Sequence, residues 1–352
     1  MTMKRRDFLK TTGAAGAAAG SIAYAPYVMA ANKPKYKWRL QTYAGSALSH
    51  EVIEPQVEAF NKAANGEMEI ELYTAGEIVP QGELFRAVQD GTVDAAQSDD
   101  DSMASPVDVA AFSAYFPFAS RFSLDVPTLW NVYGLDKIWE EAYGEVENVT
   151  WLSTGSWDPC NFASNEPINH LDDLKGKKFY MFPTVGRFMQ RFGVIPVSIP
   201  YEDVQQALTT GDLDGVAWSG ITEDYDVGWA DATNYFLTNP VSGAWAGSYF
   251  AHSPSWEKLP EHLKTLFRMS IDYSHYHRLY WYWNGEAHNR VKGTKLKLTT
   301  IPADEWAKVE DEAMKFWDEV AKKSDRSARV VKILKEYVSV MRKAGPPYRS
   351  MT

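Results

Sequence analysis

The sequence predicts an α/β protein with two similar lobes, a ligand cleft between them, and a helical C-terminal region. Three observations lead to this prediction. A strand–helix–strand–helix–strand pattern begins near residue 38, and the same order recurs from residue 178. The last helix of each copy ends at a glycine (Gly91 and Gly211), and an apolar residue and an aspartate follow two and three positions later. Amphipathic helical patterns then fill most of the chain after residue 251.

The first thirty residues are predicted to be an export signal. Arg5 and Arg6 follow Lys4, a mildly apolar stretch of small residues comes next, and Ala30 ends a small-residue cleavage site. These features are typical of the twin-arginine route to the periplasm, although a short basic helix is the alternative. Removing residues 1–30 takes the net charge from −10 to −13, since the segment holds four basic residues and one acidic residue.

The first lobe is assigned to residues 31–155, with later segments returning to it. Alternating apolar residues predict strands over 38–42 and 68–73, and a helix over 49–64 lies between them. A second helix over 81–90 and a short buried strand over 93–96 complete the first copy of the pattern.

The second lobe is assigned to residues 156–250. Its pattern is a strand at 178–181, a helix at 185–192, a strand at 196–199, a helix at 201–210 and a strand at 213–217. Ligands of open α/β sheets bind beyond the carboxyl ends of the strands, so a cleft site is expected there.

The C-terminal region, residues 251–352, is predicted to be mostly helical and to pack on both lobes. Helical patterns cover 259–284, 303–321 and 328–343. The last of these helices has an apolar side that packs on its own lobe or on a second copy of the chain, so a homodimer is one expectation.

Composition narrows the class of protein. The chain has 352 residues, 45% of them hydrophobic and 23% charged, which excludes disordered and collagen-like classes. No apolar run is long enough to span a membrane. The single cysteine, Cys160, excludes an intramolecular disulfide, and the acidic balance argues against nucleic acid as a partner. Aromatic residues make up 14% of the chain, so some are expected to line a site.

Four short motifs resemble one family of solute-binding proteins. They are the segments 72–79, 91–94, 174–179 and 211–215. In their order and spacing they are similar to the solute-binding subunits of tripartite ATP-independent periplasmic (TRAP) transporters, nearest to a branch that binds 2-oxo acids. The resemblance implies a two-lobed periplasmic binding protein fold, type II-like, that closes on a small solute and delivers it to a membrane permease.

The sequence departs from that branch at three positions of its site. Tyr180 stands where the resemblance implies a carboxylate-binding arginine, and Ala217 stands where it implies a glutamate that ligates a cation. Residues 156–159 replace a glutamine-rich loop. Arg187 and Arg191 lie on the following helix, where surface positions are expected. We therefore expect no metal and no cofactor.

Acidic and aromatic residues remain near the predicted strand ends. Carboxylates among ring faces are how proteins hold an ammonium group. A small hydroxylated amine such as ethanolamine is therefore the expected ligand, and a 2-oxo acid or another small monocarboxylate is the alternative. The predicted ligand-binding residues are Tyr43, Asp99, Asp100, Asp101, Trp157, Asp158, Tyr180, Trp218, Glu223 and Trp245.

Each of these features has a simpler interpretation. The run of three aspartates could be a solvated loop, and residues 223–226 could be the first turn of a helix. Trp157 and Trp218 could belong to the core, and Asp158 before Pro159 could form a turn. His275 and His277, two residues apart among aromatic residues, indicate packing and not a metal site.

Three classes of function fit a cleft of this kind. A secreted enzyme would use paired carboxylates, as glycosidases do, and a sensor would act through a membrane histidine kinase. The duplicated lobes and the lack of a nucleophile motif favour a non-catalytic binding protein.

Overall fold

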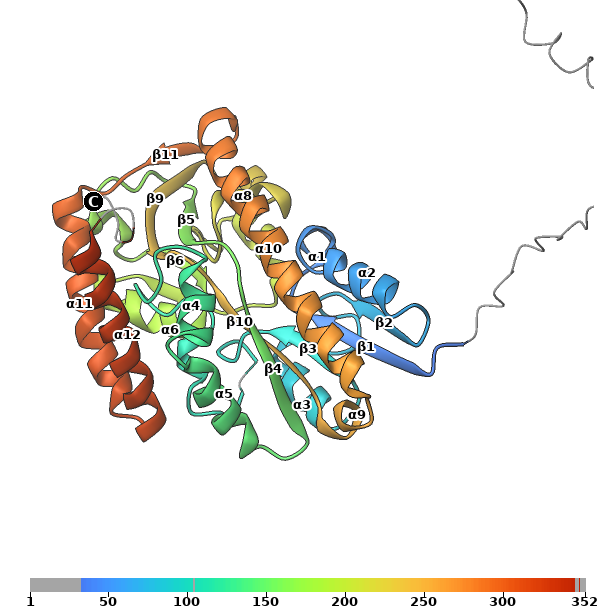
Figure 1. Cartoon of the computed structure of the whole chain (residues 1–352). Coiled ribbons are helices and arrows are strands. Elements are labelled where there is room, and N and C mark those ends of the chain that lie inside the picture. The colour runs from blue at the N-terminus through green and yellow to red at the C-terminus, as the bar shows by residue number, and fades with distance from the viewer. Residues whose placement is uncertain (1–32, 104, 346–347, 349–352) are drawn as a thin grey trace, which may run out of the picture. The chain divides into compact units, whose positions relative to one another are not determined.

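A computed structural model describes residues 33–103, 105–345 and 348, and the chain from Pro34 onward forms one compact unit (Figure 1). The predicted signal segment, residues 1–30, lies outside the described residues. The fold is α/β, with two sheets and many helices, as the sequence predicts. No described helix combines the length and the apolar character needed to cross a membrane.

The first sheet has five strands in the order β2-β1-β3-β10-β4. The three strands nearest the N-terminus run parallel, and β10 pairs antiparallel with both β3 and β4. Its strands are β1 Tyr36–Thr42, β2 Met68–Tyr73, β3 Ala95–Ser98, β4 Val149–Ser156 and β10 Ala246–His252. The helices connecting β1 to β4 are α1 Ser46–Val52, α2 Glu54–Ala63, α3 Leu84–Gln89, α4 Asp125–Asn131 and α5 Leu135–Gly144.

The second sheet has six strands in the order β11-β9-β5-β8-β6-β7. Its strands are β5 Cys160–Ser164, β6 Lys178–Met181, β7 Ile195–Val197, β8 Gly215–Ala217, β9 Tyr235–Ser242 and β11 Lys297–Thr299. Its helices are α6 Pro183–Met189, α7 Val204–Thr210 and α8 Ile221–Asp226. We call the part of the chain built on the first sheet the first half, and the part built on the second sheet the second half. Short 3-10 turns in the two halves cover Gln81–Glu83, Ala110–Phe112, Leu171–Leu174, Gln190–Phe192, Tyr201–Asp203 and Trp229–Asp231.

The chain crosses between the sheets twice at neighbouring points. Residues 157–159 lead from β4 into β5, and residues 243–245 lead from β9 back into β10. The two crossings are hydrogen-bonded to each other, since Trp157 N donates to Trp245 O at 3.1 Å and Trp245 N donates to Asp158 O at 3.0 Å. Three residues predicted to bind ligand therefore lie where the two sheets meet.

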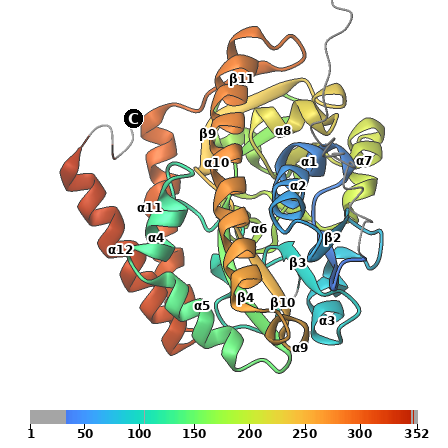
Figure 2. The same cartoon turned by 45° about the vertical axis from the view of Figure 1, so that its right-hand side comes forward.

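The C-terminal helices contact elements of both sheets. They are α9 Ser253–Glu257, α10 Glu261–Lys292, α11 Ala303–Ala321 and α12 Asp325–Ala344. The long helix α10 contacts α1, α2 and β4 beside the first sheet and α8 beside the second. Helices α11 and α12 lie side by side, and α12 packs on α4 and α5 (Figures 1 and 2).

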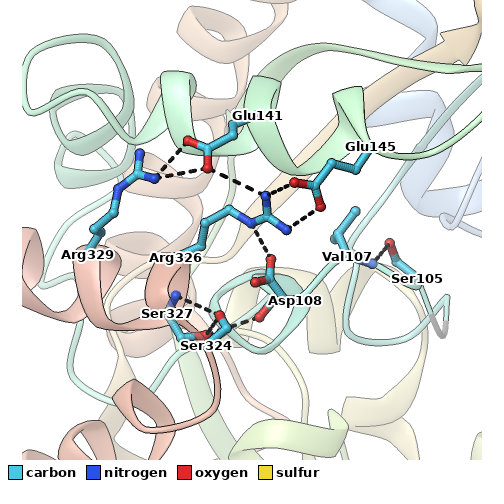
Figure 3. A network of polar contacts seen from close by, with 9 residues as sticks. All are labelled: Ser105, Val107, Asp108, Glu141, Glu145, Ser324, Arg326, Ser327 and Arg329. Atoms are coloured by element: carbon cyan, nitrogen blue, oxygen red, sulfur yellow. Dashed lines mark hydrogen bonds and ion pairs between the residues drawn. The ribbon is translucent and has the colours of Figure 1, made fainter.

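One arginine fixes the start of α12. Arg326 Nε lies 2.7 Å from Asp108 Oδ1, and its two terminal nitrogens donate to the two carboxylate oxygens of Glu145 at 2.6 Å each (Figure 3). Glu141 is shared, because it lies 3.5 Å from Arg326 and 2.8 Å from Arg329. Bidentate pairing suits the planar guanidinium, and here it joins α12 to α5 and to the loop before residue 110.

Sequence patterns placed several elements well and others less well. The strand at 178–181 and the helix at 303–321 have the predicted bounds. The helix predicted over 49–64 is two helices that part at Ile53, because Pro55 suits the first turn of a new helix and would clash inside a continuous one. The strand predicted over 93–96 starts two residues later, after the turn that Gly91 makes at φ 73°. The lobe boundaries at 155/156 and 250/251 stay predictions.

Candidate functional site

Three aromatic rings meet where the chain crosses between the sheets. The ring centroids of Trp157 and Trp245 lie 4.4 Å apart and nearly perpendicular, and Tyr43, directly after β1, lies 4.8 Å from Trp245. Gly155 and Gly247 allow this packing, because a Cβ at either position would lie under 2.5 Å from a tryptophan ring carbon. All three rings are buried, so the first and second crossings share one aromatic cluster.

Asp158 is a buried carboxylate beside this cluster. Its Oδ1 accepts a hydrogen bond from Tyr115 Oη at 2.8 Å, and its Oδ2 accepts one from Gly220 N at 2.6 Å. Burial raises the pKa of Asp158 to about 8. The side chain bonds to residues far along the chain, and residues 157–159 form no turn, so the simpler interpretation of Asp158 as a turn former is wrong.

Glu223, in the first turn of α8, is a second buried carboxylate. Its Oε2 accepts a hydrogen bond from Tyr282 Oη at 3.1 Å, whereas its Oε1 is buried without a hydrogen-bond partner in the described part of the chain. Burial, and then the charge of Asp158, holds the pKa of Glu223 well above its ordinary range. Burial, and then the charges of Glu223 and Asp158, raises the pKa of the Tyr43 hydroxyl, so these three groups lie near one another.

The same region holds buried donors that lack acceptors. The indole Nε1 groups of Trp157 and Trp245 find no acceptor among the described residues. Buried polar atoms in native proteins are nearly always hydrogen-bonded, so each exception requires an explanation. The two indole donors and the Glu223 oxygen are thus buried polar atoms whose partners are not found among the described residues.

A second aromatic group covers the strand ends of the second sheet. Trp218, just after β8, stacks on Phe182 at 3.7 Å and on Tyr180 at 4.7 Å between ring centroids. Tyr115 reaches across from the first half of the chain and meets Phe182 edge-on at 5.2 Å. Tyr180 and Trp218 are nearly fully buried, so they belong to the interface between the halves as well as to the core.

A pocket of about 490 Å³ opens to solvent beside these rings. Tyr180 and Trp218 line it from the second half, and Gln81, Gly82 and Ser102 line it from the first. The pocket therefore lies between the two halves, next to the buried aromatic and acidic groups.

Asp99, the first of three consecutive aspartates, is fully buried at the end of β3. Its Oδ1 accepts a hydrogen bond from Ser102 N at 2.6 Å, and its Oδ2 has no partner in the ranges that the structure describes. Burial, and then the charge of Asp101, raises the pKa of Asp99 to about 8. Its charge also acts on Tyr180, so Asp99 faces the space between the halves.

Asp100 points the other way, into the first half. It accepts hydrogen bonds from Trp139 Nε1 at 3.1 Å, from Ser248 Oγ at 3.0 Å and from Tyr143 Oη. With three donors already bound, its carboxylate fixes α5 against the first sheet.

Asp101 joins the two halves directly. Its carboxylate accepts hydrogen bonds from Thr184 N and from Thr184 Oγ1, each at 2.7 Å. Thr184 is in the first turn of α6, beside the second sheet, so this pair of bonds is made across the space between the halves. The aspartate run is thus not a solvated loop, since each of its three side chains faces a different environment.

The arginines near Tyr180 are engaged elsewhere. Arg187 is exposed and donates to Thr184 Oγ1 at 2.6 Å, and Arg191 pairs with Glu312 at 2.6 Å. The sequence prediction that both lie at the surface is confirmed.

One cation near the site was missed from the sequence. Arg278, on α10, is fully buried, and its guanidinium lies 3.8 Å from the ring centroid of Trp157. It donates to the carbonyl oxygens of Ser156 and Val52 at 3.2 Å each, and its Nη2 has no partner within the described residues. In the sequence, α10 shows only a pattern of aromatic residues that predicts packing. That pattern does not indicate that the side chain of Arg278 reaches residues 157–159, where the chain crosses between the sheets.

The residues do not fit the metal ion that the 2-oxo acid branch implies. Ala217 offers a methyl group where a carboxylate ligand is expected, and it is fully buried. In the part of the chain that the structure describes, no group of three His, Cys, Asp or Glu side chains could hold a metal. His277 contacts Tyr280 Oη at 2.7 Å and Glu51 O at 3.0 Å, in keeping with a packing role.

Two sheets joined by crossing strands, with unpaired buried donors and acceptors between them, define a solute-binding protein. The chain belongs to the bacterial extracellular solute-binding protein family 7, whose model matches residues 42–324. A twin-arginine translocation signal matches residues 2–20, so the protein is exported to the periplasm. Proteins of this kind in TRAP transporters bind small solutes and deliver them to membrane permease subunits.

Three similar proteins illustrate the range of ligands. A TRAP periplasmic solute-binding protein from Chromohalobacter salexigens, with bound (S)-(+)-2-amino-1-propanol, is 59% identical, with a TM-score of 0.88 over 90% of this chain and 100% of that one. A monocarboxylate 2-oxoacid-binding periplasmic protein of Nostoc sp. is 25% identical over 309 residues, 84% of this chain and 83% of that one. A TRAP protein from Pseudoalteromonas atlantica, with bound sodium and pyruvate, shares the fold at 18% identity and a TM-score of 0.77, over 88% of this chain and 95% of that one.

Proposed function

We propose that this protein captures a small protonated amine that carries a hydroxyl group, such as ethanolamine, and delivers it to a TRAP permease. The observation that supports this most is the pair of buried carboxylates, Asp158 and Glu223, with one Glu223 oxygen lacking a partner in the described structure. A cation between them would supply that missing donor and would offset the burial, and then the repulsion by Asp158, that raise the pKa of Glu223.

The neighbouring groups suit the rest of such a ligand. The rings of Tyr43, Trp157 and Trp245 present faces to a cation and apolar surface to a short carbon chain. The indole N–H groups of the two tryptophans are free to donate to a ligand hydroxyl. An amino alcohol combines the donor and the acceptor that the site lacks, and the relative from Chromohalobacter salexigens binds one.

A small monocarboxylate is the second candidate. The relative from Nostoc sp. binds 2-oxo acids, and Arg278 Nη2 is a buried donor without a partner in the described residues. Where Asp158 or Glu223 is ionised, a carboxylate ligand would meet like charge, which costs about 4 kcal/mol at 4 Å and an effective dielectric constant near 20. Such a ligand would therefore bind only the form of the site in which both acids are protonated. Arg278 is already engaged, since its guanidinium lies over the ring of Trp157 and donates to the carbonyl oxygens of Ser156 and Val52.

Calorimetry on the mature protein separates the two candidates. We expect ethanolamine and 2-amino-1-propanol to bind and to be recovered unchanged, and pyruvate to give no heat. Micromolar binding of pyruvate without binding of either amine would contradict the proposal. Glu223→Gln should lose amine binding, whereas Glu336→Gln, the same change at an exposed position on α12, should retain it.

A further inference from the structure

An aromatic stripe lies on the solvent side of α10. Each of its five side chains exposes at least half of its surface: Met269 61%, Tyr273 51%, Tyr276 66%, Tyr280 51% and Trp283 69%. The other side of the helix packs against the two halves of the protein through the buried residues Leu263, Phe267, Ile271, Ser274, Arg278 and Tyr282. Figure 2 shows α10 in front of the rest of the molecule, and the exposed fractions place the stripe on its solvent side.

The stripe has the spacing of a helix–helix seam. Its members are separated by four, three, four and three residues, which is the seven-residue repeat that brings side chains of one helix into the gaps of another. If α10 packed only against its own chain, polar residues would be expected on its solvent side.

The exposed area is large for a free surface. Aromatic side chains present about 150–250 Å² each, so the stripe exposes on the order of 600–700 Å² at the fractions given above. Monomeric proteins rarely expose a continuous apolar patch above a few hundred Å². A stable interface takes about 800 Å² from each partner, which the stripe and its rim can supply.

We propose that this stripe is the interface between two copies of the chain, with the two α10 helices antiparallel about a twofold axis at Tyr276. Met269 and Trp283 each lie seven residues from Tyr276, and Tyr273 and Tyr280 lie three and four residues from it. Met269 then meets Trp283 of the partner subunit, Tyr273 meets Tyr280 of the partner subunit, and Tyr276 meets its own counterpart. Sulfur–aromatic and aromatic pairs of this kind are favourable, and a twofold interface requires a surface that complements itself.

The chemistry of the seam favours a second copy over another occupant. None of its five side chains is charged at neutral pH, so identical surfaces meet without like-charge contacts.

The oligomeric state tests this proposal. We expect the mature protein to have the mass of a dimer by light scattering at a protein concentration of about 100 μM. Tyr276→Glu places two carboxylates on the axis and should give a monomer. Val340→Glu, at an apolar position of α12 that is 47% exposed, should leave the dimer intact.

Cross-linking adds a test that does not depend on weakening the interface. The natural Cys160 is buried, so a cysteine introduced by Tyr276→Cys would be the accessible thiol and should form a dimer on mild oxidation. Val340→Cys should not. A monomeric mature protein, a dimer that survives Tyr276→Glu, or the failure of Tyr276→Cys to cross-link would each overturn the proposal. A monomer in which Tyr276→Glu impairs only solute uptake would assign the stripe to the permease instead.

Discussion

Replacing Glu223 by glutamine should stabilise the ligand-free protein and weaken amine binding at the same time. The glutamine keeps an oxygen that can accept from Tyr282 and replaces the unpartnered oxygen by a neutral group. Because burial holds the folded pKa of Glu223 above its unfolded value, the folded state binds more protons than the unfolded state above about pH 4.5. The stability of the ligand-free protein therefore falls as pH rises through that window, and Glu223→Gln should reduce the fall.

Asp158 gives the scale of this effect. Because the pKa moves from 3.8 to about 8, burying Asp158 costs on the order of 4 kcal/mol of stability at pH 7, where the folded state keeps a proton that the unfolded state has lost. This is an upper bound, because opening of the two halves would hydrate the carboxylates. A bound cation offsets the same cost, and one lost charge-assisted hydrogen bond of about 1.5–3 kcal/mol corresponds to a roughly ten- to hundredfold weaker Kd.

Two measurements check this prediction. Thermal unfolding of the ligand-free protein from about pH 5 to pH 8 should show a higher Tm for Glu223→Gln than for wild type, with the difference largest at pH 8. Calorimetry with ethanolamine should show the loss of affinity, and Glu336→Gln should match wild type in both. An unchanged Kd, or a Tm that drops at pH 8, would refute the assignment of Glu223 as an unpaired buried acid that binds the amine.

Three further predictions follow from contacts described above. Asp101→Asn weakens the two bonds to Thr184, so ligand should dissociate faster by stopped-flow while its selectivity is kept, and Asp203→Asn at an exposed position should have no effect. Arg326→Gln should lower the Tm more than Lys335→Gln, because Lys335 makes a single, more exposed ion pair; equal effects would show that the Arg326 network adds nothing. Changing both arginines of the twin pair to lysine should abolish export, and periplasmic accumulation of that variant would contradict the twin-arginine route.

Local patterns placed elements whose signals are contained in a few residues. Helix α11 has a clear apolar side and ends where predicted, whereas the pattern over 49–64 hid a break at Ile53, because the apolar spacing of α1 continues into α2. The crossing strands β4, β5, β9 and β10 were not given bounds. Strands β5 and β10 are buried along almost their whole length and so lack alternation, and burial along β4 and β9 does not alternate strictly.

The site could be predicted only by residue type and strand position. The sequence pointed to Asp158 and Glu223, and the structure surrounds both with rings, although their contact with ligand stays a prediction. It treated the three aspartates as one feature, yet Asp100 binds inside the first half and Asp101 binds across to the second. Arg278 comes from more than a hundred residues away in sequence, so no local pattern could place it beside Trp157.

The sign of proton exchange on binding provides a last test of the ligand class. Asp158 has a pKa of about 8 when the site holds no ligand, so at pH 7 it is mostly protonated. An ammonium group requires the ionised carboxylate, and binding must therefore release a proton. The affinity should rise with pH, by up to about tenfold per unit below pH 8. Calorimetry in buffers of different ionisation enthalpy measures this release directly. A carboxylate ligand would favour the protonated acid, which already predominates at pH 7, so binding without proton release, or affinity that falls as pH rises, would rule out the amine.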